Sequence, residues 1–578
     1  SRTKSAWRGP NRPGNPATVS CFRAGGAPDM VMEAAVAAKR ALAALLLGGA
    51  LAWTQFHSSA LVGVVTDESG GVIAGAEVTA EQTQTGWRRT VHTDSEGRYQ
   101  FGRLPLGEYT LRCRQDGFRT EIRRGIVLTI GREAVVNLTL QVGEITSEVV
   151  VVGDAPRVDT RSGALGAVMD RLSIRELPLN GRDFAQLALL QPGVSPSRRS
   201  SDSGGPGTKL VVNGNRPSQV SFLLDGSDIN DANNNTPGSV AGVLLGIDTL
   251  QEFRVLTNAY SAAYGRSAGG VISAATRSGT NQFHGNLFHF LRNSALDAKN
   301  FFDPHSQPIP PFKRNQFGLV ADGPVRRDRT FFLGSFERLR QRLGVTSRSV
   351  VPNAASRQGV FPNRGPVRVE PVVGPYLELI PLPNERDFGD GTGELVSTIS
   401  TTTDENFYTG RMDHRFSDST SVFARYTHDS ASVRTPDGFG LVRSDTESRN
   451  RYLTAEAAHV FDERTFGAMR CSFNRSRGGS EPAFLQPVDP SLSFLPGRPL
   501  GQISVTGLFS LGPSRFGPSR SELDLFQWSG DLSLIRGRHS IKLGGDHRAI
   551  RLGTLRPQSP WGFYQFNSLV DFLTARPA

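Results

Sequence analysis

Alternating apolar and polar positions are the dominant pattern along this chain. The run Glu108–Arg114 (EYTLRCR) sets its apolar and polar residues on opposite faces, and Val135–Val142 (VVNLTLQV) repeats the pattern. Such runs with one apolar face are typical of half-buried antiparallel strands. Turn clusters at 94–97 and 105–107 separate them, so residues 61–142 predict a small β-sandwich. Its expected inward residues are Tyr109, Leu111, Cys113, Val136, Leu138, Leu140 and Val142.

From about residue 284 the alternation occupies segments of roughly ten residues. In 407–416 the residues Tyr408, Gly410, Met412 and Phe416 oppose Thr409, Arg411, Asp413 and Arg415, and 421–429, 452–461, 465–474 and 526–535 behave similarly. Short links at 417–420 and 462–464 contrast with long ones at 352–383 and 477–522. Short turns on one side and long loops on the other are typical of a membrane β-barrel, whose charged faces line a watery lumen.

Composition narrows the class of protein. Gly (63) and Pro (35) are frequent among the 578 residues, which favours an all-β chain over a helical one. The formal net charge is +11, but the arginines are scattered along alternating segments and form no basic face. We therefore expect no nucleic-acid binding.

The N-terminal region resembles a secretion signal. Lys39 and Arg40 precede the apolar run Ala41–Trp53, and Ser58–Ala60 offers small residues for cleavage. The alternative is a buried core helix. Residues 1–60 are thus predicted to be an upstream extension and signal peptide. Cys21, Cys113 and Cys471 fall in different segments and indicate neither a disulfide framework nor a metal cluster.

Two apparent sites fail on their context. Gly265–Gly269 fits the G-x-S-x-G pattern around Ser267, but the following residues predict a strand where a hydrolase needs a helix. Asp225, Asp228, Asn230 and Asp231 lack the calcium-loop spacing and indicate a polar turn. We therefore expect no enzyme, and assign no catalytic, cofactor-binding or metal-binding residue.

The first segment resembles a known domain. Residues 63–80 (GVVTDESGGVIAGAEVTA) and 93–118 (TDSEGRYQFGRLPLGEYTLRCRQDGF) are similar to the carboxypeptidase regulatory-like domain. The resemblance implies a seven-stranded Greek-key sandwich without catalytic residues, akin to carbohydrate-binding-like folds. We favour a spacer over a sugar-binding module.

The next segments resemble the plug and barrel of Oar-like TonB-dependent receptors. Residues 177–194, 212–231 and 247–285 carry the plug resemblance, and 312–340 and 406–429 that of the barrel, although Ala321 stands where the family usually has glycine. Asp225–Gly226 is a strong turn signal, and Gly269–Gly270 permits close backbone approach before a strand. The plug-motif candidates are Asp225, Gly226, Tyr264, Gly265, Arg266, Gly269 and Gly270.

A short β-prone run precedes the plug. In the family a TonB box lies here, and an extended segment can donate a strand to a partner sheet. The candidate box is Glu148, Val149, Val150, Val151 and Val152. The alternative is that this run is the last strand of the sandwich.

Together these features predict a mainly β chain: sandwich 61–142, linker 143–155, α+β plug domain 156–282, and the N-terminal part of a transmembrane antiparallel β-barrel at 283–578. We count roughly ten to twelve barrel strands. The family closes with about 22, so we expect an incomplete barrel.

The resemblance implies an exported receptor in the Gram-negative outer membrane that imports a ligand by plug remodelling. Its partners would be a TonB-type inner-membrane energy transducer, outer-membrane lipid and an extracellular ligand, with carbohydrates and metal chelates among the candidates. The alternative function is an adhesin or assembly factor on the same scaffold, without import.

Overall fold

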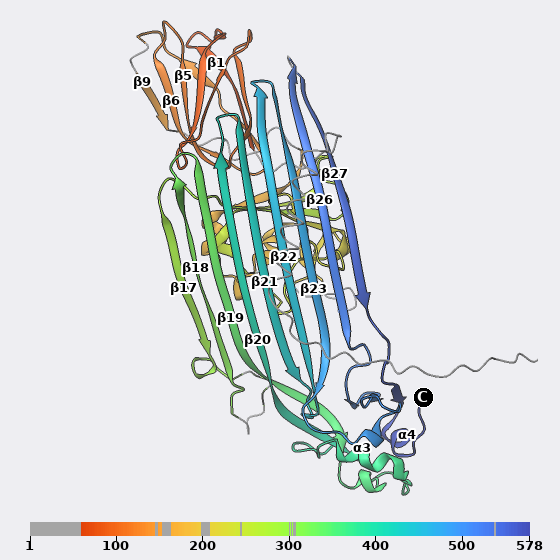
Figure 1. Ribbon diagram of the computed structural model, residues 1–578. Coiled ribbons are helices and arrows are strands. Elements are labelled where there is room, and N and C mark those ends of the chain that lie inside the picture. The colour runs from red at the N-terminus through yellow and green to blue at the C-terminus, as the bar shows by residue number, and fades with distance from the viewer. Residues whose placement is uncertain are drawn as a thin grey trace, which may run out of the picture. The chain divides into compact units, whose positions relative to one another are not determined.

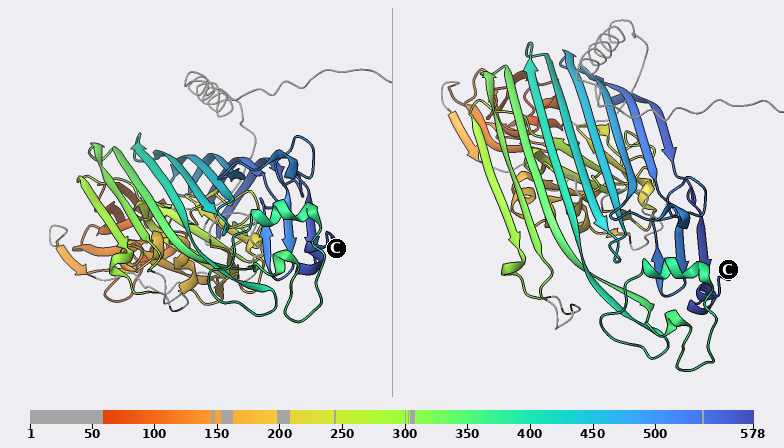
Figure 2. Two further views of the ribbon diagram at one scale, coloured as in Figure 1. Left: turned by 90° about the horizontal axis from the view of Figure 1, so that it is seen from below. Right: turned by 60° about the horizontal axis from the view of Figure 1, so that its bottom comes forward.

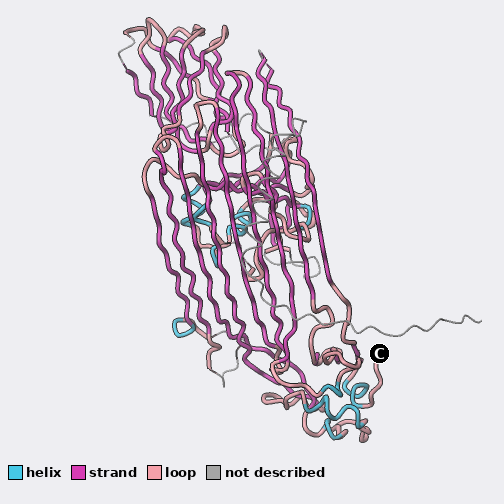
Figure 3. Tube along the Cα trace, in the orientation of Figure 1, coloured by secondary structure: helices cyan, strands magenta, loops and turns pink. Residues whose placement is uncertain are grey.

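The computed structural model describes residues 59–144, 148–152, 163–197, 208–242, 245–299, 301, 303, 308–536 and 539–578. Strand structure dominates these residues, and helix is confined to short segments (Figure 3). This confirms the mainly β fold class. The central part of the predicted secretion signal, Lys39–Trp53, and Cys21 lie outside the described residues.

The first segment is a two-sheet sandwich. One sheet has the order β4-β1-β7, with β8 also paired to β1, and the other has the order β3-β2-β5-β6-β9. Because β7 and β8 both pair in parallel with β1, they act as one interrupted strand. The bounds are β1 (Ser59–Asp67), β2 (Glu77–Gln82), β3 (Arg88–His92), β4 (Arg98–Leu104), β5 (Gly107–Arg114), β6 (Thr120–Leu128), β7 (Glu133–Val135), β8 (Leu138–Leu140) and β9 (Glu148–Val152).

The sandwich core matches the alternation with one exception. All the residues predicted to point inward are buried in it except Val142, whose exposed fraction is 72%. That prediction was wrong because β8 ends at Leu140, and Val142 makes only an isolated bridge to Phe118 beyond the sheet. Burial raises the pKa of the free Cys113 thiol to about 12.

The plug is built on a sheet of order β10-β15-β16-β13-β14. Its core is formed by residues of these strands, of β12 and of the short helices beside them, together with Ile229 and with Tyr452 of the barrel. The bounds are β10 (Leu165–Asp170), α2 (Arg171–Glu176), η1 (Asn180–Arg182), η2 (Phe184–Leu190), β11 (Val194–Pro196), β12 (Leu210–Val212), η4 (Pro217–Gln219), β13 (Val220–Leu224), β14 (Ser227–Asp228), η5 (Ile247–Thr249), β15 (Leu250–Asn258) and β16 (Gly270–Thr276).

In the described residues, nine long antiparallel strands form one open sheet with the plug against one face (Figures 1 and 2). Neighbours in the sheet are also neighbours in the chain, apart from short strands inserted between β23 and β26. The bounds are β17 (His284–Asn293), β18 (Phe312–Arg326), β19 (Thr330–Pro352), β20 (Thr392–Arg415), β21 (Thr420–Pro436), β22 (Val442–Asp462), β23 (Thr465–Phe484), β26 (Ser519–Arg536) and β27 (His539–Leu555).

Most of these strands are longer than the predicted ten residues. β20 has 24 residues, and at about 3.3 Å per residue such a strand spans roughly 80 Å. The apolar band of a membrane barrel is only about 25 Å tall. About 9–11 tilted residues cross such a band, so the predicted segments have the length of one crossing and the strands continue beyond them.

In the long sheet, apolar side chains are exposed and charged side chains are buried, which is the reverse of the pattern in a soluble protein. Tyr408, Met412 and Tyr426 are exposed, whereas Arg425 and Asp429 are buried on the other face. This is the predicted division into an apolar outer face and a polar inner face. Among the described residues, no helix is long and apolar enough to cross a membrane.

The long connections at one end of the sheet fold onto one another. Three further described strands form a sheet of order β25-β24-β28, and its residues share an apolar core with the two α-helices nearby. The predicted loop 477–522 is thus partly wrong, because it overlaps β23 and β26 and contains two strands. The bounds are η6 (Ser294–Leu296), η7 (Ser356–Gln358), η8 (Pro371–Val373), α3 (Gly374–Glu378), η9 (Pro490–Leu492), β24 (Gln502–Val505), β25 (Phe509–Leu511), β28 (Phe563–Phe566) and α4 (Leu569–Leu573).

Candidate functional site

A two-residue turn presents the first plug-motif residues to the barrel wall. Leu224 and Ser227 pair across the β13–β14 hairpin, so Asp225 and Gly226 are its loop. Their φ angles are +47° and +77°. Positive φ at both positions is what a type I′ hairpin turn requires, which explains why Asp-Gly occurs here.

Asp225 joins the plug to two barrel arginines. Its carboxylate accepts hydrogen bonds from the backbone N–H and the hydroxyl of Thr276, both at 2.8 Å. It also forms ion pairs with Arg425 at 3.2 Å and Arg411 at 3.4 Å. Burial alone would raise the pKa of this carboxyl, but Arg425 and Arg411 outweigh burial and hold the pKa below its usual value. The Asp225 carboxyl is therefore ionised at neutral pH, and its contacts with Arg425 and Arg411 are ion pairs.

Asp228, in the same hairpin, makes a second charged contact with the barrel. Its carboxylate pairs with Arg266 of the plug and, at 2.7 Å, with Arg548 of β27. Asp231 pairs with Lys209 at 3.2 Å, and the Asn230 amide donates to the carbonyl of Val220. These side chains therefore bond within the protein, as a polar turn predicts, and among the described residues no group of three or more acidic, His or Cys side chains could hold a metal ion.

The remaining plug-motif residues lead into β16. A Cβ atom on Gly269 would lie 2.9 Å from the carbonyl oxygen of Gln219, and one on Gly270 would lie 2.9 Å from that of Leu256. The predicted close backbone approach is confirmed. Tyr264 packs edge-on against Tyr260 at 6.5 Å between ring centroids, whereas a Cβ on Gly265 would meet nothing within 4 Å.

Further polar groups join the plug to the barrel. Glu337 of β19 accepts from Arg182 at 3.0 Å and from the backbone N–H of Gly246 at 3.0 Å. Asp322 of β18 pairs with Arg277. Hydrogen bonds and ion pairs thus hold the plug to the wall. Apolar contacts add to them at Tyr452, which joins the plug core, and where Leu245 meets Leu339 and Phe407. The predicted watery lumen is, in the described sheet, a polar surface that binds the plug.

Two contacts that sequence reasoning missed join the sandwich to the other parts. Glu252 and Arg254 of β15 bond the backbone N–H and carbonyl of Ile130, respectively. Arg103 of β4 donates to both carboxylate oxygens of Asp531 at 2.7 Å and to Glu456 at 3.0 Å. For β15 the available signal was two ionisable residues, Glu252 and Arg254, at alternate positions among the apolar residues of the strand, because a buried polar group needs a partner.

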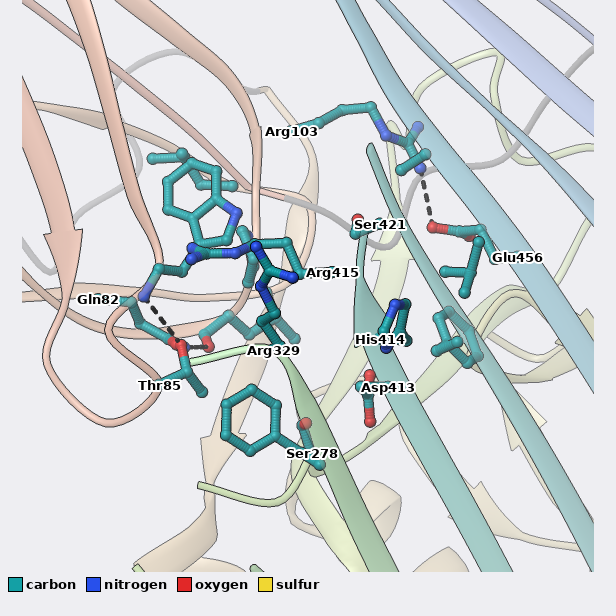
Figure 4. A pocket seen from close by; sticks show the side chains of 18 of the residues that line it. Gln82, Thr85, Arg103, Ser278, Arg329, Asp413, His414, Arg415, Ser421 and Glu456 are labelled. Atoms are coloured by element: carbon teal, nitrogen blue, oxygen red, sulfur yellow. Dashed lines mark hydrogen bonds and ion pairs between the residues drawn. The ribbon is translucent and has the colours of Figure 1, made fainter. Parts of the chain in front are cut away.

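A cavity of about 230 Å³ lies where these three parts meet. Figure 4 shows Gln82 and Thr85 of the sandwich on one side and Asp413 and His414 of β20 on the other, with the Arg103–Glu456 ion pair beside them. The short turn 417–420 also lines the cavity, which places it at the short-turn end of the sheet. Its lining carries both signs of charge. The lining arginines are Arg89, Arg103, Arg277, Arg329, Arg411 and Arg415.

The candidate box lies in the sandwich. Glu148–Val152 forms β9, which pairs in parallel with β6 from Thr120 to Arg124. The alternative interpretation, a last strand of the sandwich, therefore describes the position of the segment correctly. Its recognition by a transducer stays a prediction.

Three family models match the chain. They are described as a carboxypeptidase regulatory-like domain at residues 60–141, a TonB-dependent receptor plug domain at 161–271 and an outer membrane beta barrel domain at 275–578.

Among curated proteins, the TonB-dependent transporter Oar of Myxococcus xanthus is 31% identical over 309 residues. The match covers 51% of this chain and 28% of that protein, so the chain spans well under two thirds of its relative's length.

Solved structures with similarity include the outer membrane transporter YddB from Escherichia coli, at 13% identity and a TM-score of 0.45, covering 70% of this chain and 50% of that one. A variant of the ferric enterobactin receptor PfeA from Pseudomonas aeruginosa matches at 13% identity and a TM-score of 0.41, covering 67% of this chain and 49% of that one.

Proposed function

Because the chain belongs to the Oar-like TonB-dependent receptors of the Gram-negative outer membrane, we propose that it binds an extracellular ligand and imports it through energy-dependent remodelling of its plug. A TonB-type transducer of the inner membrane would supply the energy by pairing with Glu148–Val152. The ligand class stays open between carbohydrates and metal chelates.

The observation that carries this proposal is the character of the plug–barrel contact. Apart from Tyr452, the apolar core of the plug comes from the plug itself, and Asp225, Asp228 and Arg182 reach the wall through charged pairs. Water can replace polar contacts as they break, whereas separating an apolar interface exposes surface at a cost of about 25 cal/mol per Å². Such a plug can shift or partly unfold and return.

The position of β9 is consistent with this proposal. The sandwich contacts the barrel beside the short turns, where Arg103 meets Asp531 and His92 meets Glu463. Short turns face the periplasm in outer-membrane barrels. This position supports the proposal, because a TonB-type transducer would approach from the periplasm.

A substitution in the box tests the proposal. Val150→Pro removes a backbone N–H that strand pairing uses, while Val149→Ala keeps the main chain intact. In the intact protein, Val150→Pro should abolish binding of the transducer's periplasmic domain, and Val149→Ala should leave it near normal. Equal binding by both variants would refute the box, and adhesion that persists without the transducer would favour the adhesin.

A further inference from the structure

The outer edge of β6 carries a strand that the sandwich core does not need. Five consecutive residue pairs, from Thr120–Glu148 to Arg124–Val152, join β6 to β9 in parallel. The apolar core of the sandwich comprises residues from Leu61 to Leu140 and includes none of the β9 side chains that the structure describes. Of the β9 side chains that the structure describes, Val149 and Val151 are half-buried and Val150 is 48% exposed.

This arrangement makes β9 easy to detach. An edge strand outside the apolar core is held by main-chain hydrogen bonds and by partial burial of its side chains, here Val149, Val150 and Val151. Each hydrogen bond contributes only about 0.5–1.5 kcal/mol net because water replaces it. Strands β5 and β8, by contrast, place Leu111 and Leu140 in the core at 0% exposure. Loss of β9 would remove no described side chain from that core.

Detachment also decides where a pulling force acts. In chain order β9 precedes β10, the first strand of the plug, which pairs with β15. While β9 is bound to β6, tension applied to β9 is borne by the sandwich. Once β9 is released, the same tension passes along the chain to β10.

We propose that the outer edge of β6 is a strand-docking surface whose resting occupant is Glu148–Val152, and that a transducer engages this segment only after it leaves β6. The inference rests on the proposed function, because it takes Glu148–Val152 to be the transducer-binding segment. The sandwich then acts as an internal competitor for the strand that the transducer binds.

A reversible cross-link tests the inference. Ile122 and Val150 are register partners, and adjacent strands lie about 4.8 Å apart, within the Cα–Cα range of a disulfide. In the intact, detergent-solubilised Ile122→Cys/Val150→Cys variant, oxidation should remove two reactive thiols and weaken binding of the transducer's periplasmic domain by at least about tenfold. Reduction should restore it.

The matched control is Thr79→Cys/Thr90→Cys, which joins β2 to β3 at the opposite edge of the same sheet. Its oxidation should leave binding unchanged. Equal binding by the oxidised and reduced Ile122→Cys/Val150→Cys variant, or failure of that disulfide to form, would overturn the docking proposal alone. Absence of binding by the parent protein would instead overturn the proposed function, and the inference with it.

A second measurement needs no substitution. Binding of the periplasmic domain to the parent protein should increase amide hydrogen exchange in Thr120–Arg124, because β6 loses its neighbour. Unchanged exchange in β6 together with new protection in β9 would mean that the partner adds to the other edge of β9, and would contradict release.

Discussion

The carboxylate of Asp225 in the plug lies 3.2 Å from the guanidinium of Arg425 in the barrel, whose side chain is 0% exposed. Breaking such a pair from one side leaves a buried charge without compensation, which costs about 3–5 kcal/mol. Arg411 keeps Asp413 as a second partner at 2.7 Å, so Arg425 bears most of the loss.

Asp225→Asn should therefore loosen the plug and raise its susceptibility to protease in outer-membrane vesicles. The control is Asp418→Asn, because Asp418 is 81% exposed and 3.9 Å from Arg415, and an exposed pair contributes about 0–1 kcal/mol. Since the folded state lowers the pKa of Asp225, its contribution is present above the unfolded pKa of about 4 and is lost as pH falls through the lower folded pKa. The parent should lose this stabilisation in acid. The stability of Asp225→Asn should fall less as the pH is lowered.

Glu252 should give the opposite pH dependence. Burial raises the pKa of its carboxyl to about 8. The folded state then holds an extra proton between about pH 4 and 8, and the free energy of unfolding falls by up to about 1.4 kcal/mol per pH unit as pH rises through that window.

Glu252→Gln keeps an oxygen that can accept from Ile130 but cannot ionise. Thermal unfolding of the parent and of this variant at pH 5 and pH 8 checks the prediction. The parent should be less stable at pH 8, and the variant should show a smaller difference. The same slope in both proteins would assign the pH dependence to other groups.

The sequence predicted the parts of this fold that repeat a simple period. Alternation placed Leu111 in the sandwich core and Arg425 on the inner face of the barrel, because a strand turns successive side chains to opposite sides. It could not reveal that Arg425 meets Asp225, because the two residues come from different parts of the chain. It also left the position of Val150 open, since a short apolar run is equally suited to an edge strand and to a partner's sheet.

Ser267 should not react with probes that label nucleophilic serines. The strand β16 begins at Gly270, directly after the G-x-S-x-G run, where a nucleophile elbow would continue as a helix. A fluorescent phosphonate should leave the protein unlabelled. Labelling that disappears in Ser267→Ala would contradict this prediction.

Two glycines of the plug motif should differ sharply in their tolerance of alanine. A Cβ on Gly270 would lie 2.8 Å from a methyl of Val212 and 2.9 Å from the carbonyl oxygen of Leu256, whereas one on Gly265 would meet nothing within 4 Å. The Leu256 carbonyl belongs to β15, which pairs with β16, so it can move only if the sheet distorts. Overpacking of this kind costs about 1–3 kcal/mol.

Gly270→Ala should therefore speed proteolysis of the plug in outer-membrane vesicles, and Gly265→Ala should leave the rate within error of the parent. Equal rates of proteolysis for the two variants would mean that the sheet around β16 can adjust to a Cβ atom. The close backbone approach would then not be the reason for glycine at position 270.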